Sequence, residues 1–131
     1  MSFLLDTNIC VALLRSGSEG IPKHLRSLDP EDIYLCSVVR AELLYGARKS
    51  RWVEENLALV ERFCAQFESL PFDDKAASFY GITRAILTKA GASIGANDLL
   101  VASIGLAHDL TIVTRNTREF SRVPGLRIES W

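Results

Sequence analysis

Short apolar runs alternate with longer segments of helical periodicity along most of this chain. The runs Phe3–Leu5, Ile33–Cys36 and Thr111–Thr114 have the length and composition of buried strands. Leu70–Phe72 is a shorter extended candidate, and Leu126–Ile128 is expected to be a final edge strand. No hairpin-type turn signal joins any two of these runs. The pattern therefore predicts strands joined by crossovers, which is typical of a parallel sheet.

Between these runs, apolar residues recur three and four positions apart, which predicts helices. Ser37 is expected to cap the helix that follows it, whereas Asp73 is expected to open a helix that Lys89 and Gly91 close. Two helices, 37–50 and 52–68, should form an arm, whereas the last is apolar on nearly every face and should be buried. The expected helices span 7–15, Pro22 to about Leu28, 37–50, 52–68, 73–89 and 96–108. Strands alternating with helices predict an α/β fold: a central, mainly parallel twisted sheet of four to five strands with helices on both faces.

Composition narrows the class of protein without fixing its partners. With 131 residues and 48% hydrophobic side chains, residues 1–131 are expected to form a single domain with a real core. A net charge of −1 neither indicates nor excludes nucleic acid. The three cysteines lie in apolar stretches without a CxxC pair, which favours structural thiols in a reducing cytoplasm. The longest uncharged stretch, Leu99–Ala107, is too short for a membrane span, so no membrane partner is expected.

Three carboxylates stand where solvated charges are not expected. Asp6 follows the first apolar run, Asp98 opens an almost wholly apolar helix, and Glu42 has apolar neighbours one helical turn away on both sides. Singly, Asp6 could cap the helix it precedes, Asp98 could serve the positive end of its helix dipole, and Glu42 could extend from a helix edge to solvent. Three such residues converging on one end of one sheet favour a shared role instead. Because a buried carboxylate needs a partner and few cations lie nearby in sequence, a divalent metal is indicated, and oxygen-only ligands favour Mg²⁺ or Mn²⁺.

A fourth polar group follows the strand at 111–114. Asn116 and Glu119 have the spacing of a capping box, with Asn in place of Ser or Thr. The functional alternative makes Asn116 a neutral ligand of the metal or of its water and places Glu119 as an acid nearby. Both interpretations stay open at this stage.

These residues together resemble the PIN-domain family, and specifically the VapC toxins of type II toxin–antitoxin systems. The matching pieces are in the family's order and extend over nearly the whole chain: Leu5-Asp6-Thr7-Asn8, Arg40-Ala41-Glu42-Leu43 with Tyr45-Gly46-Ala47, Gly95-Ala96-Asn97-Asp98-Leu99-Leu100, Val113-Thr114-Arg115-Asn116 with Arg118-Glu119-Phe120, and the closing Pro124-Gly125-Leu126 with Glu129-Ser130-Trp131. The resemblance implies a PIN-like α/β/α sandwich, and a Mg²⁺-dependent endoribonuclease, with Mn²⁺ as a substitute, that inhibits translation.

By the same resemblance, Asp6, Glu42 and Asp98 form the acidic metal-binding set and Thr7 orients the first acid or a bound water. Asn116 is placed with the catalytic residues and Asn97 beside them; many family members carry Asp where this chain has Asn116, so either Glu119 compensates or a second metal binds only with RNA. RNA contacts are expected from nearby cations: Arg40, Arg48, Lys49, Arg51, Arg115 and Arg118.

The resemblance also implies partners. A cognate VapB-type antitoxin is expected to fill a groove between the helices of the N-terminal half and to reach the acids, and two copies of the chain are expected to form a homodimer. The overall sequence resembles VapC proteins that cut initiator tRNA in the anticodon region.

Three other protein classes compete with this interpretation. A haloacid-dehalogenase-type phosphatase needs a second Asp where Asn8 stands, and a receiver domain needs an acidic pair at the first strand. Both are disfavoured. A PIN-fold module that binds RNA or a partner without cutting stays open, because Asn116 replaces a frequent acid.

Overall fold

The computed structural model describes residues 1–16, 25 and 27–131, and it contains one five-stranded sheet. The strand order is β3-β2-β1-β4-β5, and every neighbouring pair is parallel. The strands are β1 (Phe3–Leu5), β2 (Ile33–Cys36), β3 (Glu68–Leu70), β4 (Thr111–Val113) and β5 (Arg127–Glu129). This arrangement confirms the predicted α/β fold with a parallel sheet.

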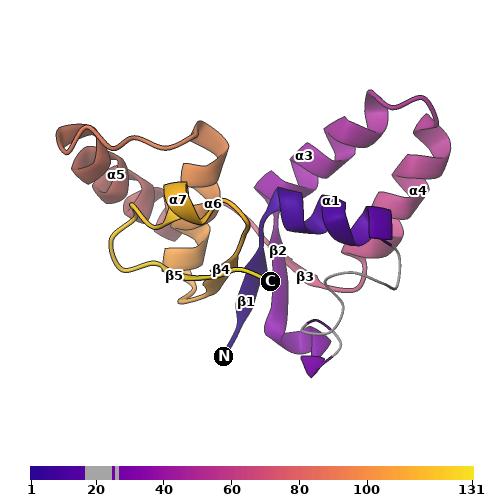
Figure 1. Cartoon of the computed structure of the whole chain (residues 1–131), viewed down its shortest axis with the longest axis horizontal. Helices are drawn as coiled ribbons and strands as arrows, with labels where there is room; N and C mark the ends of the chain where they lie inside the picture. Colours follow the sequence, from indigo (N-terminus) through magenta and orange to yellow (C-terminus); the bar gives the residue numbers. More distant parts are fainter. Residues whose placement is uncertain (17–24, 26) are drawn as a thin grey trace.

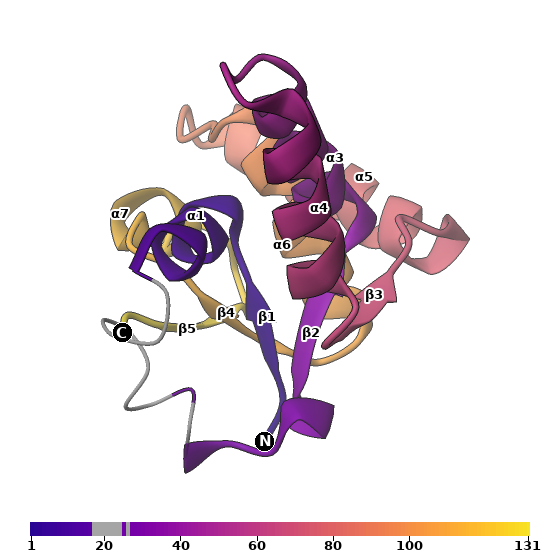
Figure 2. The same cartoon turned by 90° about the vertical axis from the view of Figure 1, so that its right-hand side faces the viewer.

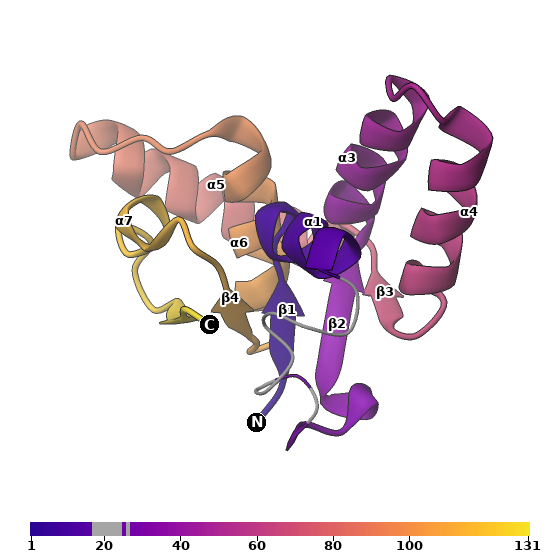
Figure 3. The same cartoon turned by 45° about the vertical axis from the view of Figure 1, so that its right-hand side comes forward.

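Helices connect consecutive strands and cover both faces of the sheet. In Figure 3, α1 lies in front of the sheet and α5 and α6 lie behind it, while α3 and α4 form an arm that Figure 1 shows at the upper right. The helices are α1 (Thr7–Ser16), the short 3₁₀ turn η1 (Pro30–Asp32), α3 (Ser37–Arg48), α4 (Val53–Cys64), α5 (Asp74–Lys89), α6 (Ala96–Ala107) and α7 (Thr117–Phe120). The helix expected from Pro22 to about Leu28 falls largely outside the described residues. Within the described part of the chain, no helix is long and apolar enough to cross a membrane.

The order of the strands creates a switch point beside β1. From β1 the chain moves outward to β2 and β3, and then it returns to place β4 on the other side of β1. The connections that leave the carboxyl ends of β1 and β4 therefore diverge to opposite sides. In open parallel sheets this divergence opens the crevice in which ligands bind. The view in Figure 2 shows α1 and α7 on one side of β1, with α3, α4 and α6 on the other.

The core is centred on the two strands that flank the switch point. All residues of β1 and β4 are buried, and α6 packs against them with most of its circumference buried, as its apolar sequence predicted. Gly105 allows this close approach, since a Cβ there would lie 2.7 Å from Cδ1 of Ile112. Apolar packing therefore holds the central strands in place, and the polar groups at their ends add to it.

Two predicted boundaries on the far side of the sheet are wrong. Helix α4 ends at Cys64 rather than continuing to Glu68, and β3 comprises Glu68–Leu70 rather than Leu70–Phe72. The apolar spacing misleads because Phe63 and Phe67 still meet edge to face, 5.4 Å apart, across a tight turn that has replaced the helix. Parallel pairing with β2 makes Glu68–Leu70 a strand, and the residue pattern of this segment alone does not reveal that pairing.

The cap predicted at Ser37 is wrong, and the helix predicted to open at Asp73 begins one residue later. Asp73 accepts a hydrogen bond from the backbone N–H of Ala76 at 3.0 Å and caps α5. Ser37 is instead the first residue of α3, and its hydroxyl donates to the carbonyl of Leu70 at 3.4 Å. It thus links the arm to β3.

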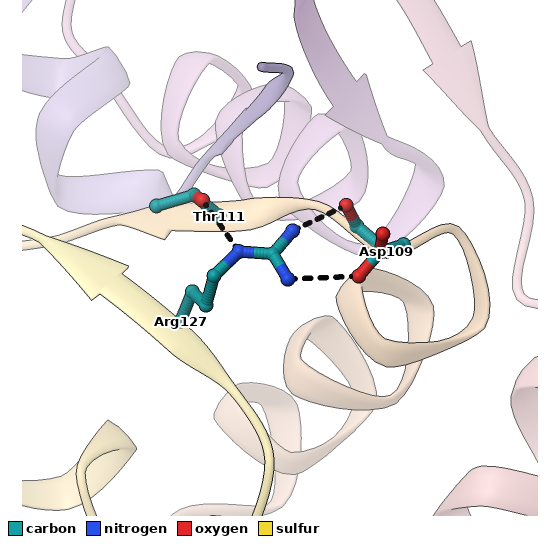
Figure 4. Close-up of polar contacts among 3 residues, drawn as sticks. All are labelled: Asp109, Thr111 and Arg127. Carbon is teal, nitrogen blue, oxygen red and sulfur yellow. Dashed lines mark hydrogen bonds and ion pairs between the residues drawn. The ribbon is translucent and has the colours of Figure 1, made fainter.

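The edge strand β5 is held by an arginine clamp (Figure 4). Arg127 donates to the side chain of Asp109 at 2.9 Å, to the backbone carbonyl of Asp109 at 2.8 Å and to the hydroxyl of Thr111 at 3.4 Å. Asp109 has φ +54°, a left-handed conformation that Asp tolerates better than most residues. The clamp joins β5 to the turn between α6 and β4, so the strand lies one residue later than the predicted Leu126–Ile128.

Candidate metal centre

Asp6 lies at the carboxyl end of β1, at the switch point, and its side chain is only 4% exposed. One carboxylate oxygen, Oδ1, accepts a hydrogen bond from the backbone N–H of Ile9 at 3.0 Å. The other, Oδ2, accepts one from the hydroxyl of Thr114, at the end of β4. The helix-cap interpretation is therefore confirmed through Oδ1, whereas Oδ2 is held by a residue of the neighbouring strand end.

The environment of Asp6 opposes its negative charge. Burial raises the pKa of Asp6, and the negative charge of Glu42 raises it further, whereas the hydrogen bonds from Thr114 and Ile9 and the charge of Arg115 lower it. The groups that bind the Asp6 carboxylate are neutral donors. Within the described residues the ion pairs are Arg40–Glu61 and Arg127–Asp109, and neither includes Asp6. A buried carboxylate without a cation is the situation that a metal ion relieves.

Glu42 reaches the same end of the sheet from the middle of α3. It is half-buried, and its Oε1 accepts a hydrogen bond from the hydroxyl of Thr7 at 2.7 Å. The resemblance implied that Thr7 orients Asp6 or a water, but in the structure Thr7 holds Glu42 and Thr114 holds Asp6. Since Thr7 directly follows Asp6, this bond ties α3 to the beginning of α1.

Asp98 lies in the first turn of α6 and forms a cluster with Asn116 and Glu119. The side-chain amide of Asn116 donates to Oδ2 of Asp98 at 3.2 Å and to Oε2 of Glu119 at 2.5 Å. Burial, the neighbouring Glu119 and the charge of Asp6 raise the pKa of Asp98 to about 6. Of the two interpretations of Asn116, the capping box is wrong, because the side chain forms no capping bond to α7 and joins two carboxylates instead.

These oxygen donors fit a hard divalent cation. The described residues contain no group of three His, Cys, Asp or Glu side chains close enough to ligate one ion together. A bound ion would therefore take one or two of these carboxylates and keep several waters, which is how Mg²⁺ usually binds proteins. Oxygen donors without histidine or cysteine are compatible with Mg²⁺ or Mn²⁺, the ions named in the sequence-based prediction.

The cations expected near the site divide into three groups. Arg115 and Arg118 are exposed on either side of Asn116, and the charge of Arg115 reaches Asp6. Arg40 is engaged in the 2.8 Å ion pair with Glu61, which joins α3 to α4. The remaining three, Arg48, Lys49 and Arg51, are exposed at the far end of the arm, and Asn97 is exposed beside Asp98.

A groove of about 1130 Å³ runs from the acidic site along the arm. Thr7, Glu42 and Asn97 line one end, and Lys49 and Ser50 line the other. Its walls between these ends are mostly apolar and come from α1, α3, α4 and the start of α6: Val11, Leu14, Val38, Leu43, Ala47, Leu59, Val60 and Leu100. An apolar groove with charged ends suits an amphipathic helix.

Sequence reasoning missed Thr114 as a site residue. It is fully buried, and besides donating to Asp6 its hydroxyl accepts from the backbone N–H of Asn116 at 2.8 Å. The one feature of the sequence that could have indicated this role is a threonine at the end of an apolar strand. Threonine is common in strands, so its presence there needs no functional explanation. The bond to Asp6 spans 108 residues and becomes visible only in the fold.

A family comparison matches residues 3–126 to the PIN domain. Among characterised proteins, the tRNA(fMet)-specific endonuclease VapC of Salmonella typhimurium is 39% identical over 131 residues, which cover 100% of this chain and 98% of that protein. Ribonuclease VapC2 of Rickettsia felis is also 39% identical, over 132 residues with the same coverage.

Solved structures give the same result. The fold matches VapBC2 from Rickettsia felis bound to a DNA fragment from its promoter, with a TM-score of 0.94, 38% identity and coverage of 100% of this chain and 99% of the other. DNA-bound VapBC from Salmonella typhimurium gives a TM-score of 0.93 at 37% identity, covering 100% and 98%.

Thr114→Val should destabilise the protein by about 2 kcal/mol, because it leaves Oδ2 of Asp6 and the N–H of Asn116 buried without partners. The pKa of Asp6 should rise further, and Mn²⁺ affinity should fall. Chemical denaturation and Mn²⁺ titration measure the two effects. The matched control is Thr111→Val at the start of β4, where only a 3.4 Å contact from Arg127 is lost. Equal losses in both variants would show that the hydroxyl of Thr114 has no special role.

Mn²⁺ affinity should fall as the pH is lowered through about 6, the pKa of Asp98. The metal binds the deprotonated carboxylate, so protonation competes with it and affinity should drop roughly tenfold between pH 7 and pH 5. Calorimetric titration across this range tests the expectation. Asp98→Asn should bind weakly with a flatter profile; a wild-type affinity that does not change with pH would contradict the assignment of Asp98 as a ligand.

Proposed function

This chain belongs to the PIN-domain family, in its VapC ribonuclease branch, and we propose that it is a divalent-metal-dependent endoribonuclease, the toxin of a toxin–antitoxin pair. The observation that carries the proposal is the buried carboxylate of Asp6 at the switch point, held by neutral donors and facing further acids on α3 and α6. A fold places such a charge at a ligand-binding crevice only when something there compensates it. We further propose that residues 1–131 act as a single domain.

Asp6 and Asp98 are the residues we expect to hold the ion. When bound, a divalent ion supplies an activated water and relieves negative charge on the scissile phosphate. Thr114 keeps Asp6 ionised and oriented by donating to Oδ2. Glu42, oriented by the hydroxyl of Thr7, would hold a water rather than join Asp6 and Asp98 around one ion, because these three carboxylates do not form a single ligand group. No Ser, Cys or His nucleophile is needed for this chemistry.

Asn116 and Glu119 adjust Asp98 in this mechanism. The amide of Asn116 lowers the pKa of Asp98, while the nearby Glu119 raises it. We propose that Asn116 keeps its neutral amide on Asp98 where many family members carry a further acid, and that either Glu119 supplies the missing charge or a second ion would bind only with RNA. Asn97, exposed at the rim of the groove, is assigned to substrate contact.

Cations beside the acids would hold the RNA backbone once the metal has reversed the field of the site. Arg115 and Arg118 are the nearest exposed candidates, and Arg40 would first have to leave Glu61. The proposed substrate is initiator tRNA, cut in the anticodon region with loss of translation. The support for this choice is the name and 39% identity of the Salmonella typhimurium relative.

The apolar groove is the proposed site for a VapB-type antitoxin. Its lining suits the apolar face of a helix, and its acidic end would accept a basic side chain that displaces metal and substrate together.

Exposed Ile82 and Ile86, one turn apart on α5, support a homodimer. The buried free thiols of Cys10, Cys36 and Cys64 support a cytoplasmic location.

Binding of RNA without cleavage is the second candidate function. It is favoured by one observation, the amide of Asn116 placed between Asp98 and Glu119, where a further acid would otherwise increase the negative charge of the site.

Asp6→Asn and Asp98→Asn should each reduce Mg²⁺- or Mn²⁺-dependent RNA cleavage by at least 100-fold, because each removes a charged ligand from a site that depends on metal chemistry. Sequencing of RNA 5′ ends after a pulse of expression would locate the cut. Asp74→Asn, which changes an exposed acid in the first turn of α5, is the control that should keep full activity. If wild-type protein with Mn²⁺ binds RNA but cuts no cellular RNA, the second candidate function replaces the first.

Leu59→Arg should weaken antitoxin binding by at least 10-fold and leave RNA cleavage unchanged. The side chain lines the groove and is 42% exposed, so a charge there obstructs an apolar partner without disturbing the core. Ala58→Arg, on an exposed position of the same helix outside the groove lining, is the matched control. Titration of the purified toxin with its antitoxin measures both; equal affinities would place the antitoxin elsewhere.

A further inference from the structure

The tip of the α3–α4 arm, residues 45–52, carries two exposed aromatic rings, each with a cation over it. Tyr45 is 65% exposed and Trp52 is 59% exposed. The Nζ atom of Lys49 lies 5.2 Å from the centre of the Tyr45 ring, and Cζ of Arg51 lies 5.0 Å from that of Trp52. Leaving two large rings in water is unfavourable, so a surface of this kind is expected to have a ligand.

The charge of the arm tip differs from that of the whole protein. Residues 45–52 contain Arg48, Lys49 and Arg51 but no acid, although the chain has a net charge of −1. Within the described part of the chain these cations take part in no ion pair. Glu54 and Glu55 follow in the first turn of α4, where they offset the helix dipole. Unpaired cations interleaved with exposed aromatic rings match the chemistry of single-stranded nucleic acid.

The arm tip is connected to the acidic site along one face of α3. Tyr45 and Lys49 follow Glu42 at spacings of three and seven residues, so they lie one and two turns further along the same face. All three residues line the groove. A strand bound at Tyr45 would therefore lie one helical turn from Glu42, about the reach of one nucleotide.

Gly46 supplies an independent observation at the same place. It lies inside α3, where glycine weakens a helix, yet a Cβ at this position would have no atom within 4 Å. Packing therefore gives no reason for its small size. Gly46 lines the groove beside Tyr45, so the missing side chain leaves open backbone where a ligand can approach closely.

Building on the proposed ribonuclease function, we propose that the arm tip binds unpaired nucleotides of the RNA substrate. Bases stack on Tyr45 and Trp52, phosphates contact Arg48, Lys49 and Arg51, and the strand passes Gly46 to reach the carboxylates. A protein partner would have to be strongly acidic to match these cations, and it would gain little from rings already covered on one side by a cation. RNA satisfies the rings and the charges together.

Binding measured without divalent metal tests the proposal independently of cleavage. Fluorescence anisotropy with a short single-stranded RNA, in buffer containing a chelator, should show losses of affinity of about 5- to 100-fold for Tyr45→Ala and Trp52→Ala. Tyr45→Phe and Trp52→Phe keep a stacking face and should stay within about threefold of wild type. An RNA duplex of the same composition should bind more weakly and be insensitive to all four changes.

Salt dependence separates the cations from the rings. Lys49→Ala and Arg51→Ala should each reduce the slope of log affinity against log salt concentration by about 0.7, the value for one phosphate contact on a single strand. Arg62→Ala, an exposed cation elsewhere on α4, should leave the slope unchanged. Tyr45→Ala should lower affinity without changing the slope.

Fluorescence gives a direct signature of stacking. The chain has two tryptophans, so Trp131→Phe leaves Trp52 as the only tryptophan, which can be excited selectively over the tyrosines. Single-stranded RNA should quench this variant on binding, and the duplex should not. Full anisotropy binding without quenching would overturn the stacking role of Trp52.

Two glycine substitutions distinguish a functional role from a structural one. Gly46→Ala and Gly81→Ala both replace a helical glycine whose Cβ would meet nothing within 4 Å, and both should raise the melting temperature by a few degrees. Only Gly46→Ala should weaken RNA binding, because Gly81 lies on α5 outside the groove. Equal RNA binding by both variants would contradict a close approach at Gly46.

Two outcomes would overturn the proposal as a whole. One is RNA affinity within twofold of wild type for both Tyr45→Ala and Trp52→Ala. The other is unchanged RNA binding together with weaker antitoxin binding in these variants, which would assign the arm tip to the protein partner. Failure of the ribonuclease function looks different: wild-type protein would then bind RNA through the arm tip but leave it uncut when Mn²⁺ is added.

Discussion

The structure depends on one buried carboxylate, Asp6, at the carboxyl end of the central strand of a parallel sheet. Asp6 follows the fully buried strand β1, and burial alone would favour its protonated form. Two donors from different parts of the chain, the N–H of Ile9 and the hydroxyl of Thr114, stabilise the ionised form. The first bond begins α1 and the second joins β1 to β4 at their carboxyl ends. The same interactions that make the site therefore also fix the centre of the fold.

A cost in stability accompanies this arrangement. Asp98 has a pKa raised to about 6, and both Asp6 and Glu119 contribute negative charge to its surroundings. In the metal-free protein these charges repel one another, because only neutral groups such as Asn116 stand between them. A bound cation would reverse that repulsion, so folding stability and metal affinity are coupled at this site.

The arm extends the site beyond the acids. Helix α3 carries Glu42 near its middle and ends in the exposed basic tip, while its buried residues Val39, Leu43 and Ala47 anchor it to the core. One face of α3 thus packs against the core, and another face lines the groove. An apolar groove wall and a basic, aromatic tip lie next to each other, so the proposed antitoxin helix and the proposed RNA strand would occupy neighbouring surfaces.

The sequence by itself determined the fold class, the buried character of α6, and the three unusual acids, because burial and periodicity leave a local record in residue type. It misplaced the end of α4 and the start of β3, where pairing with β2 overrides a helical pattern. Only the tertiary structure decided which hydroxyl serves which acid: Thr114, rather than the adjacent Thr7, holds Asp6. Contacts between residues far apart in sequence depend on how the strands are ordered, and no local pattern records that order.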